Sequence, residues 1–311
     1  MRSVLSKRQC GSAGHRYRVM EKKILVIGST VADVIIELKD KMPATGEDSH
    51  VKRQYLSLGG CACNVYEGIR RFGMPCDLFS PVGEGPYGDF IKKELKKRGI
   101  PTLIPPVQEE NGCCYCFVEP SGERTFVSWH GTEYRFRREW LDRIDTQQYD
   151  TVYICGLEIE EETGENIVAF LEKHAGLRVF FAPGPRLKRI PPALLQRIYA
   201  TSPILHLNRT EALEASGCSA VLDAALSLYQ KTGSPVVVTL GADGCCCFDG
   251  KTFDTIPARR VRQVNTNGAG DAHAGALIAC LERGDPIAEA VRKANDFSAE
   301  VVCGGWVPGS A

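Results

Sequence analysis

The segment Asn265–Cys280 (NTNGAGDAHAGALIAC) joins a glycine-rich turn and a carboxylate to the start of an apolar helix. The first N–H groups of a helix have no partner within it, and the positive end of the helix dipole adds to their attraction for anions. The small residues Gly268, Ala269 and Gly270 let this main chain approach a phosphate closely. Asp271 follows directly and could accept the proton of an attacking hydroxyl. This pattern indicates phosphoryl transfer, in which a protein mainly positions groups and stabilises negative charge.

Each of these features also has a purely structural interpretation. The turn at Asp271 is also typical of a capped, glycine-rich helix start. Asn208 and Glu211 have the spacing of a helix capping box, although the same pair could lie near a triphosphate and Mg²⁺. The chain has no GxxxxGK[ST] phosphate loop. GSTVAD at residues 28–33 does not supply the GxGxxG of a nicotinamide-dependent oxidoreductase.

Four segments taken together resemble the signatures of the ribokinase family, the PfkB-type carbohydrate kinases. Gly268–Asp271 is similar to the C-terminal signature, and Gly59–Asn64 (GGCACN) to the N-terminal one. Asn208–Glu211 resembles the Asn-x-x-Glu element of the family, and Thr239–Gly244 its nucleotide loop. They occur in the family's order and spacing, so the resemblance covers about residues 22–305. EPSGERTF and GPRL, beginning at Glu119 and Gly184, resemble an uncharacterised bacterial sugar-kinase branch.

The resemblance implies an ATP- and Mg²⁺-dependent kinase that phosphorylates a hydroxyl of a sugar or sugar-like molecule. It implies that Asp271 is the base and that the amides of Gly268, Ala269 and Gly270 form an anion hole. Substrate contacts are implied for Asp33, Gly59, Gly60, Asn64 and Glu158. Nucleotide contacts are implied for Asn208, Thr239, Gly241, Gly244 and Asn295, and contact with Mg²⁺ through water for Glu211. Asp33 could instead be a turn residue, and Glu158 part of a solvated acidic face with the glutamates at 160–162.

Strand-like apolar runs alternate with helical ones, which favours βαβ units and a parallel sheet covered on both faces. The expected fold is α/β, a ribokinase-like three-layer sandwich with a mostly parallel central sheet and a small β lid. Residues 34–58 and 113–129 lack helical periodicity and are predicted to form a small antiparallel sheet outside the main one. By resemblance this sheet is the lid that closes over the sugar, and a homodimer can form through it.

The chain departs from the family pattern at two positions that bear on its partners. Asn265 stands where relatives have an aspartate that helps to bind a monovalent cation, which argues against K⁺ activation. Val31 stands where ribokinase has a polar substrate contact, which argues against ribose. Nucleosides and phosphosugars stay open as substrates, and a phosphosugar would need basic lid residues such as Arg124, Arg135, Arg137 and Arg138. The alternative outside enzymes is a non-catalytic sugar- or nucleotide-binding regulator on the same fold.

Composition narrows the partners and the compartment. Lys+Arg and Asp+Glu are both 38, so no basic excess attracts nucleic acid or an anionic membrane. No apolar run approaches the roughly 18 residues of a membrane span. The 14 cysteines fit no pair of zinc-ligand motifs and are expected to be small apolar residues, reduced in the cytosol. We therefore expect a cytoplasmic protein with a disordered extension at residues 1–19 and a kinase domain at 20–311.

Overall fold

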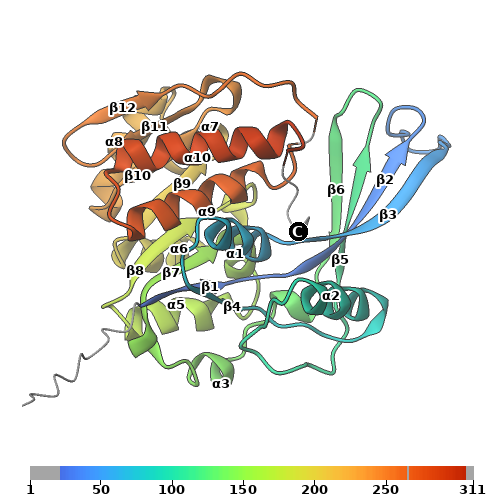
Figure 1. Cartoon of the computed structure of the whole chain (residues 1–311), viewed down its shortest axis with the longest axis horizontal. Coiled ribbons are helices and arrows are strands. Elements are labelled where there is room, and N and C mark those ends of the chain that lie inside the picture. Colours follow the sequence, from blue (N-terminus) through green and yellow to red (C-terminus); the bar gives the residue numbers. More distant parts are fainter. Residues whose placement is uncertain (1–21, 265, 306–311) are drawn as a thin grey trace, which may run out of the picture.

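The computed structural model describes residues 22–264 and 266–305 and contains two β-sheets of different size (Figure 1). The larger sheet has eight strands in the order β12-β11-β10-β9-β8-β7-β1-β4, and the smaller has four in the order β3-β2-β5-β6. The strands are β1 Lys23–Ile27, β2 Val31–Leu38, β3 Val51–Gly59, β4 Cys76–Phe79, β5 Cys113–Val118, β6 Arg124–Trp129, β7 Tyr149–Cys155, β8 Arg178–Ala182, β9 Ile204–Asn208, β10 Val236–Thr239, β11 Cys245–Phe248 and β12 Phe253–Ile256.

Helices cover both faces of the large sheet, which gives the predicted three layers (Figure 1). One face packs against α1, α2, α9 and α10, and the other against α5, α6, α7 and α8. The α-helices are α1 Cys61–Arg71, α2 Gly85–Lys97, α3 Arg138–Leu141, α4 Gly156–Ile159, α5 Gly164–Lys173, α6 Pro192–Ala200, α7 Arg209–Ser216, α8 Val221–Thr232, α9 Ala269–Glu282 and α10 Ile287–Val302.

The large sheet is mostly parallel, as the sequence predicts. Its strands from β10 to β4 in the spatial order run parallel, and β11 alone is reversed, so that its pairings with β10 and with β12 are antiparallel. Parallel strands need both faces covered, and the central strands are correspondingly apolar throughout. Ligands of such open sheets bind beyond the carboxyl ends of the strands, where Glu158, Asn208 and Thr239 lie here.

The small sheet corresponds to the predicted lid but differs from the expected antiparallel arrangement. β2 pairs antiparallel with β3, and β5 pairs antiparallel with β6. The central pair, β2 with β5, is parallel, in register from Ala32 with Cys113 to Glu37 with Val118. The reason is topological: each hairpin is a local unit, but the long excursion between β2 and β5 returns the chain in the same direction.

The lid is fastened to the core at one of its faces and at its base. Val34, Ile36 and Leu38 form an apolar cluster against which Tyr87 of α2 packs. At the base the buried carboxylate of Glu133 accepts hydrogen bonds from the amides of Gly112 (2.8 Å) and Gly131 (2.9 Å), one on each side of the β5–β6 hairpin. The lid therefore has a fixed attachment, while β3 and β6 are largely exposed.

Several predictions lie at or beyond the limits of the described chain. The extension at residues 1–19 and Asn265, on which the argument about K⁺ depends, lie outside the described residues. Within the described ranges, no helix combines the length and apolar character required to cross a bilayer. The cysteines described are all free thiols, and the clusters at 113–116 and 245–247 lie in strands β5 and β11.

Candidate active site

Two closely packed helices bring the predicted base to the N-terminal signature. Gly275 of α9 lies so close to α1 that a Cβ atom there would be 2.6 Å from Val65 O, and Gly68 faces it from α1. This close approach places Asn64 Nδ2 2.8 Å from Asp271 Oδ2, across 207 residues of sequence. The two signature segments therefore form one site, in which the Asp271 carboxylate contacts Asn64 of α1.

The glycine pair at the start of α1 is required by backbone geometry. Gly60 has a φ of 96°, and a Cβ there would lie 2.5 Å from Ser29 O. A Cβ at Gly59 would overlap Asp33 Oδ2. Only glycine lets β3 pass beside Asp33 and then turn into the helix. This turn also places Asp33 and Asn64 in the wall of the same cavity.

A cavity of about 400 Å³ lies between the lid and the start of α1. Most of its wall, polar and apolar side chains alike, comes from the lid sheet, and Asn64, Val264 and Asn267 complete it. The lining residues are Asp33, Ile35, Glu37, Tyr55, Ser57, Leu58, Gly59, Asn64, Val118, Arg124, Val264 and Asn267. Of the predicted substrate residues, Asp33, Gly59 and Asn64 are therefore together in the wall, and Asp271 adjoins it through its bond to Asn64.

Burial holds both aspartates of the site closer to protonation than usual. It raises the pKa of Asp271 to about 6, although hydrogen bonds from Asn64 and Cys61 oppose the shift. Burial also raises the pKa of Asp33 to about 7; a hydrogen bond from Asn267 and the charge of Arg124 lower it, whereas the charge of Asp271 raises it. A carboxylate whose pKa lies near 6 is better matched to proton transfer at neutral pH than an ordinary aspartate.

The turn before α9 matches the predicted anion site in outline. Gly268 is the N-cap residue, with a left-handed φ of 72°, and Asp271 lies in the first helical turn. The amide of Ala269, however, donates to Thr266 O at 3.2 Å. In this conformation one of the three predicted donors is therefore engaged, because the Ala269 amide closes the turn itself.

Glu158 does not line the cavity, which corrects the expectation of direct access to the substrate. Its side chain is 1% exposed, and its Oε1 accepts the amide of Ser29 at 2.8 Å. Burial raises its pKa to about 7. The sequence interpretation as a solvated acidic face is also wrong for this residue, because α4 turns the side chain inward beneath the loop at Gly28. Its Oε2 accepts no hydrogen bond from the described residues.

The predicted nucleotide residues lie at the carboxyl ends of β9 and β10. Asn208 and Glu211 form a complete capping box: Glu211 N donates to Asn208 Oδ1 at 2.9 Å, and Asn208 N and Nδ2 donate to the Glu211 carboxylate at 3.0 and 2.7 Å. Thr239 ends β10, and Gly241 and Gly244 have φ values of 64° and 102° in the turn that follows. The capping interpretation is confirmed, and these contacts leave the nucleotide role as a prediction.

Asn295 lies on α10 with only 6% of its surface exposed. Its Nδ2 donates to Ile256 O at 3.1 Å and to Pro257 O at 3.4 Å, and its Oδ1 faces His273 Nε2 at 3.1 Å. The amide is therefore engaged by protein groups, and its contact with a nucleotide stays a prediction.

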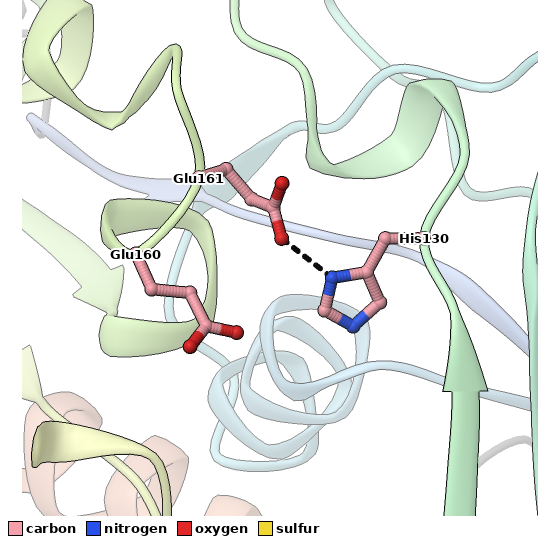
Figure 2. Close-up of side chains that lie close together, drawn as sticks. All are labelled: His130, Glu160 and Glu161. Atoms are coloured by element: carbon pink, nitrogen blue, oxygen red, sulfur yellow. Dashed lines mark hydrogen bonds and ion pairs between the residues drawn. The ribbon is translucent and has the colours of Figure 1, made fainter. Parts of the chain in front are cut away.

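A histidine and two glutamates meet where the lid joins the carboxyl end of β7 (Figure 2). His130 Nδ1 lies 2.6 Å from Glu161 Oε1, and Glu160 forms an ion pair with Arg186 at 2.7 Å. The His130 ring stacks on Tyr134 with a centroid distance of 3.9 Å. Such a donor set could hold a divalent cation, but here Arg186 balances Glu160, and His130 and Glu161 satisfy one another. The cluster serves to fasten the end of β6 to the core.

Sequence reasoning missed several residues that complete the site. Asn267 supports Asp33, and Cys61 supports Asp271, each by a side-chain hydrogen bond. Ser57 and Tyr55 line the cavity from β3. A pattern-based signal existed only for β3, where alternation places Tyr55 and Ser57 on the same face. Nothing in the local sequence indicates that positions so far apart along the chain meet.

Comparison with known proteins places this geometry in a family. A model of the pfkB family of carbohydrate kinases matches residues 21–305. The chain is 35% identical over 285 residues to the uncharacterized sugar kinase YegV of Escherichia coli (strain K12), over 90% of this chain and 88% of that protein. It is 28% identical over 280 residues to the ribokinase of Mus musculus, over 86% and 84% of the two chains. The structure of the ribokinase from Giardia lamblia has a TM-score of 0.79 at 23% identity, covering 91% of this chain and 94% of that one, and shows the same fold.

Proposed function

The chain belongs to the pfkB family of carbohydrate kinases, and on that premise we propose that it transfers the γ-phosphoryl group of ATP to a hydroxyl of a sugar or nucleoside with Asp271 as the base. One observation carries the proposal: the Asp271 carboxylate adjoins the cavity wall through its 2.8 Å bond to Asn64, at the first turn of a helix that begins with a glycine-rich turn. This arrangement unites a proton acceptor with an anion-binding helix start.

In the proposed step, the acceptor hydroxyl gives its proton to an Asp271 carboxylate oxygen while the hydroxyl oxygen forms a bond to the γ-phosphorus. The bond between that phosphorus and the bridging oxygen to the β-phosphate breaks, and ADP leaves. Negative charge on the transferring group is stabilised by main-chain donors at Gly268 and Gly270 and by the dipole of α9. Asn64 orients Asp271 by donating to one of its oxygens.

We propose that the nucleotide lies over the carboxyl ends of β9 and β10, beside Asn208, Thr239, Gly241 and Gly244. Glu211 would hold Mg²⁺ through water. The chain fits this role: the Glu211 oxygens accept hydrogen bonds from Asn208 but keep lone pairs for a metal-bound water, and Mg²⁺ retains several waters in such sites. When bound, Mg²⁺ neutralises phosphate charge.

We propose a neutral polyol as the acceptor. Of the four arginines considered for a phosphosugar, Arg124 lines the cavity; Arg137 and Arg138 instead form ion pairs with Glu109 and Asp142. Glu37 lines the same wall but is paired with Arg53 at 3.4 Å, so Arg124 is the one basic group among the lining residues. A phosphate dianion would find there a single arginine whose charge already acts on Asp33, whereas a carboxylate accepts hydrogen bonds from hydroxyls well. Asp33 is the proposed acceptor-binding group.

We further propose that the lid mediates a homodimer. Its outer strands expose large apolar side chains, with Phe126 and Val127 each 52% exposed and Trp129 47% exposed. Val127 and Trp129 lie on one face of β6 and Phe126 on the other, and large exposed apolar side chains grouped on one element can mark an interaction site. Sedimentation of wild-type protein and of Phe126→Asp tests this: a dimer that dissociates in the variant supports the proposal, and a wild-type monomer at micromolar concentration contradicts it.

The function is tested by an ADP-release assay with ATP and Mg²⁺ over a panel of sugars and nucleosides, with Asp271→Ala as the blank. We expect acceptor-dependent ADP release in the wild-type protein and its loss in the variant. ATP turnover that no acceptor stimulates, or that persists in Asp271→Ala, would contradict the proposal. A panel with phosphosugars included checks the preference for a neutral acceptor.

A further inference from the structure

A chain of three buried polar side chains runs behind the site, linking β9, α9 and α10. His206, His273 and Asn295 are 8%, 2% and 6% exposed. His206 Nε2 lies 2.9 Å from His273 Nδ1, and His273 Nε2 lies 3.1 Å from Asn295 Oδ1. His273, the middle member, follows Asp271 by two residues on α9, so the chain of side chains passes close to the proposed base.

The hydrogen-bond partners of Asn295 fix the tautomers of both histidines. Asn295 Nδ2 donates to the carbonyls of Ile256 and Pro257, so its Oδ1 must be the atom that faces His273. His273 must then carry its proton on Nε2, which leaves a lone pair on Nδ1. His206 must donate to that lone pair from its own Nε2. One arrangement of protons satisfies the contacts from His206 through His273 to Asn295, and both rings are neutral in it.

The environment favours the same neutral state. Burial lowers the pKa of His273 to about 4 and, with the neighbouring His273 charge, lowers that of His206 to about 3. Protonating His273 would direct its Nδ1 proton at the His206 donor. The chain therefore keeps one polarity at neutral pH, and it can act as a fixed spacer between α9 and α10.

At the Asn295 end, the hydrogen-bonded side chains contact the main-chain segment that leads to the proposed phosphate site. The Ile256 and Pro257 carbonyls lie at the end of β12, where the segment that returns to Gly268 begins. From the other side this segment is in close contact with Gly244, since a Cβ at Gly244 would overlap Ile256 O and lie 2.6 Å from Ala258 N. Asn295 and Gly244 of the proposed nucleotide loop thus contact the same strip of main chain, residues 256–258.

We propose that His273 is a positioning residue for the nucleotide: by donating to Asn295 it fixes the Ile256–Pro257 strip against Gly244 and so preserves the shape of the nucleotide loop. This inference rests on the proposed nucleotide position over β9 and β10. His273 contacts neither substrate, and its effect passes through Asn295. His206 sets the orientation of the His273 ring but lies on the side away from the strip.

Three variants separate positioning from mere burial. His273→Phe keeps an aromatic ring but removes the donor to Asn295, and Asn295→Leu removes the other partner of the same contact. His206→Phe also removes one buried hydrogen bond, but the His273 donor remains, because reversing its tautomer would set the Nε2 lone pair against Asn295 Oδ1. A structural role alone predicts similar behaviour of the two histidine variants, whereas positioning predicts that they differ.

The measurement is the ATP dissociation constant by calorimetry without acceptor, with the melting temperature of each variant recorded. We expect His273→Phe and Asn295→Leu to weaken ATP binding about tenfold, the equivalent of one net hydrogen bond with its unpaired partner. His206→Phe should bind ATP within about twofold of wild type although its melting temperature also falls. In turnover assays the KM for ATP should rise in His273→Phe with kcat changed less.

The outcomes are distinguishable from failure of the proposed function. Wild-type protein that binds no ATP would overturn both. Wild-type protein that binds ATP while His273→Phe binds equally tightly, or while His206→Phe is equally impaired, would overturn this inference alone. If the variants do not fold, ¹⁵N spectra of histidine-labelled wild-type protein still decide: both rings should be neutral Nε2–H tautomers, and an Nδ1–H tautomer at His273 contradicts the inference.

Discussion

The large sheet and the lid are built from similar strands but place them in opposite environments. β7 of the large sheet is buried at every residue except Asp150, whereas β6 of the lid has no fully buried residue. The proposed base is held in the first region, where α1 and α9 are packed through glycines. The cavity wall that faces it comes largely from the second, through Asp33 on β2 and Arg124 on β6. Chemistry is therefore assigned to the rigid region and recognition to the exposed one.

This division has a physical reason. Positioning a proton acceptor demands side chains fixed by packing on every side, since small misplacements reduce rates strongly. Recognition and release of an acceptor require a surface that can open, and strands with few buried contacts open most readily. Asp33 lies where the two regions meet: β2 starts at Val31, which is 3% exposed, and leads outward into the lid.

The largest expected effect is on kcat, through the proposed base in the rigid region. Asp271→Asn removes the proton acceptor but keeps the shape of the side chain, so kcat should fall about 10²-fold or more. ATP binding should change little. The melting temperature should not fall, because burial already disfavours the ionised carboxylate in the folded state. Turnover near that of the wild-type protein would refute the assignment of the base.

The next effect concerns recognition by the lid-side wall. Asp33→Ala removes hydrogen bonds between a charged group and the acceptor, each worth about 1.5–3 kcal/mol, so the acceptor KM should rise about 10- to 100-fold. The KM for ATP should stay near the wild-type value. Leu222→Ala, at a 52% exposed position on α8, is a control that should leave both constants unchanged. Equal changes in both constants would show that Asp33 does not discriminate between the two substrates.

The pH dependence of activity should show two transitions, one from Asp271 in the rigid region and one from Asp33 on the lid. Asp271 acts only when deprotonated, so below its pKa of about 6 activity should fall about tenfold per pH unit. Asp33, whose pKa is about 7, accepts hydrogen bonds best when ionised, so kcat/KM for the acceptor should also rise with pH through about 7. In Asp33→Asn only the lower transition should remain. An unchanged profile in that variant would mean that the upper transition belongs to another group.

The smallest effect on turnover concerns the packing beneath the site. Gly275→Ala places a Cβ 2.6 Å from Val65 O, and such overpacking typically costs about 1–3 kcal/mol of the free energy of unfolding. Because α1 must move away from α9, the Asn64–Asp271 bond should lengthen and kcat should fall a few-fold. Gly176→Ala is the matched control: no atom lies within 4 Å of its new Cβ, and stability should change by less than about 0.5 kcal/mol. Chemical denaturation measures both.

The sequence alone predicted the elements whose signals are local. The alternation of strand-like and helical apolar runs predicted the mostly parallel sheet. The four family-like segments gave the family, which the comparisons confirm. The lid segments were located to within a few residues, because residues 34–58 and 113–129 lack helical periodicity. In each case the evidence lies within one stretch of chain.

Only the tertiary structure decided which of those residues meet. The bond between Asn64 and Asp271, the inward turn of Glu158, the parallel pairing of β2 with β5 and the chain from His206 to Asn295 all join segments far apart in sequence. Local propensity and periodicity describe which face of an element is apolar, not which partner that face meets. Side-chain contacts across elements depend on crossing distances such as that set by Gly68 and Gly275, and those follow from the packing of the whole core.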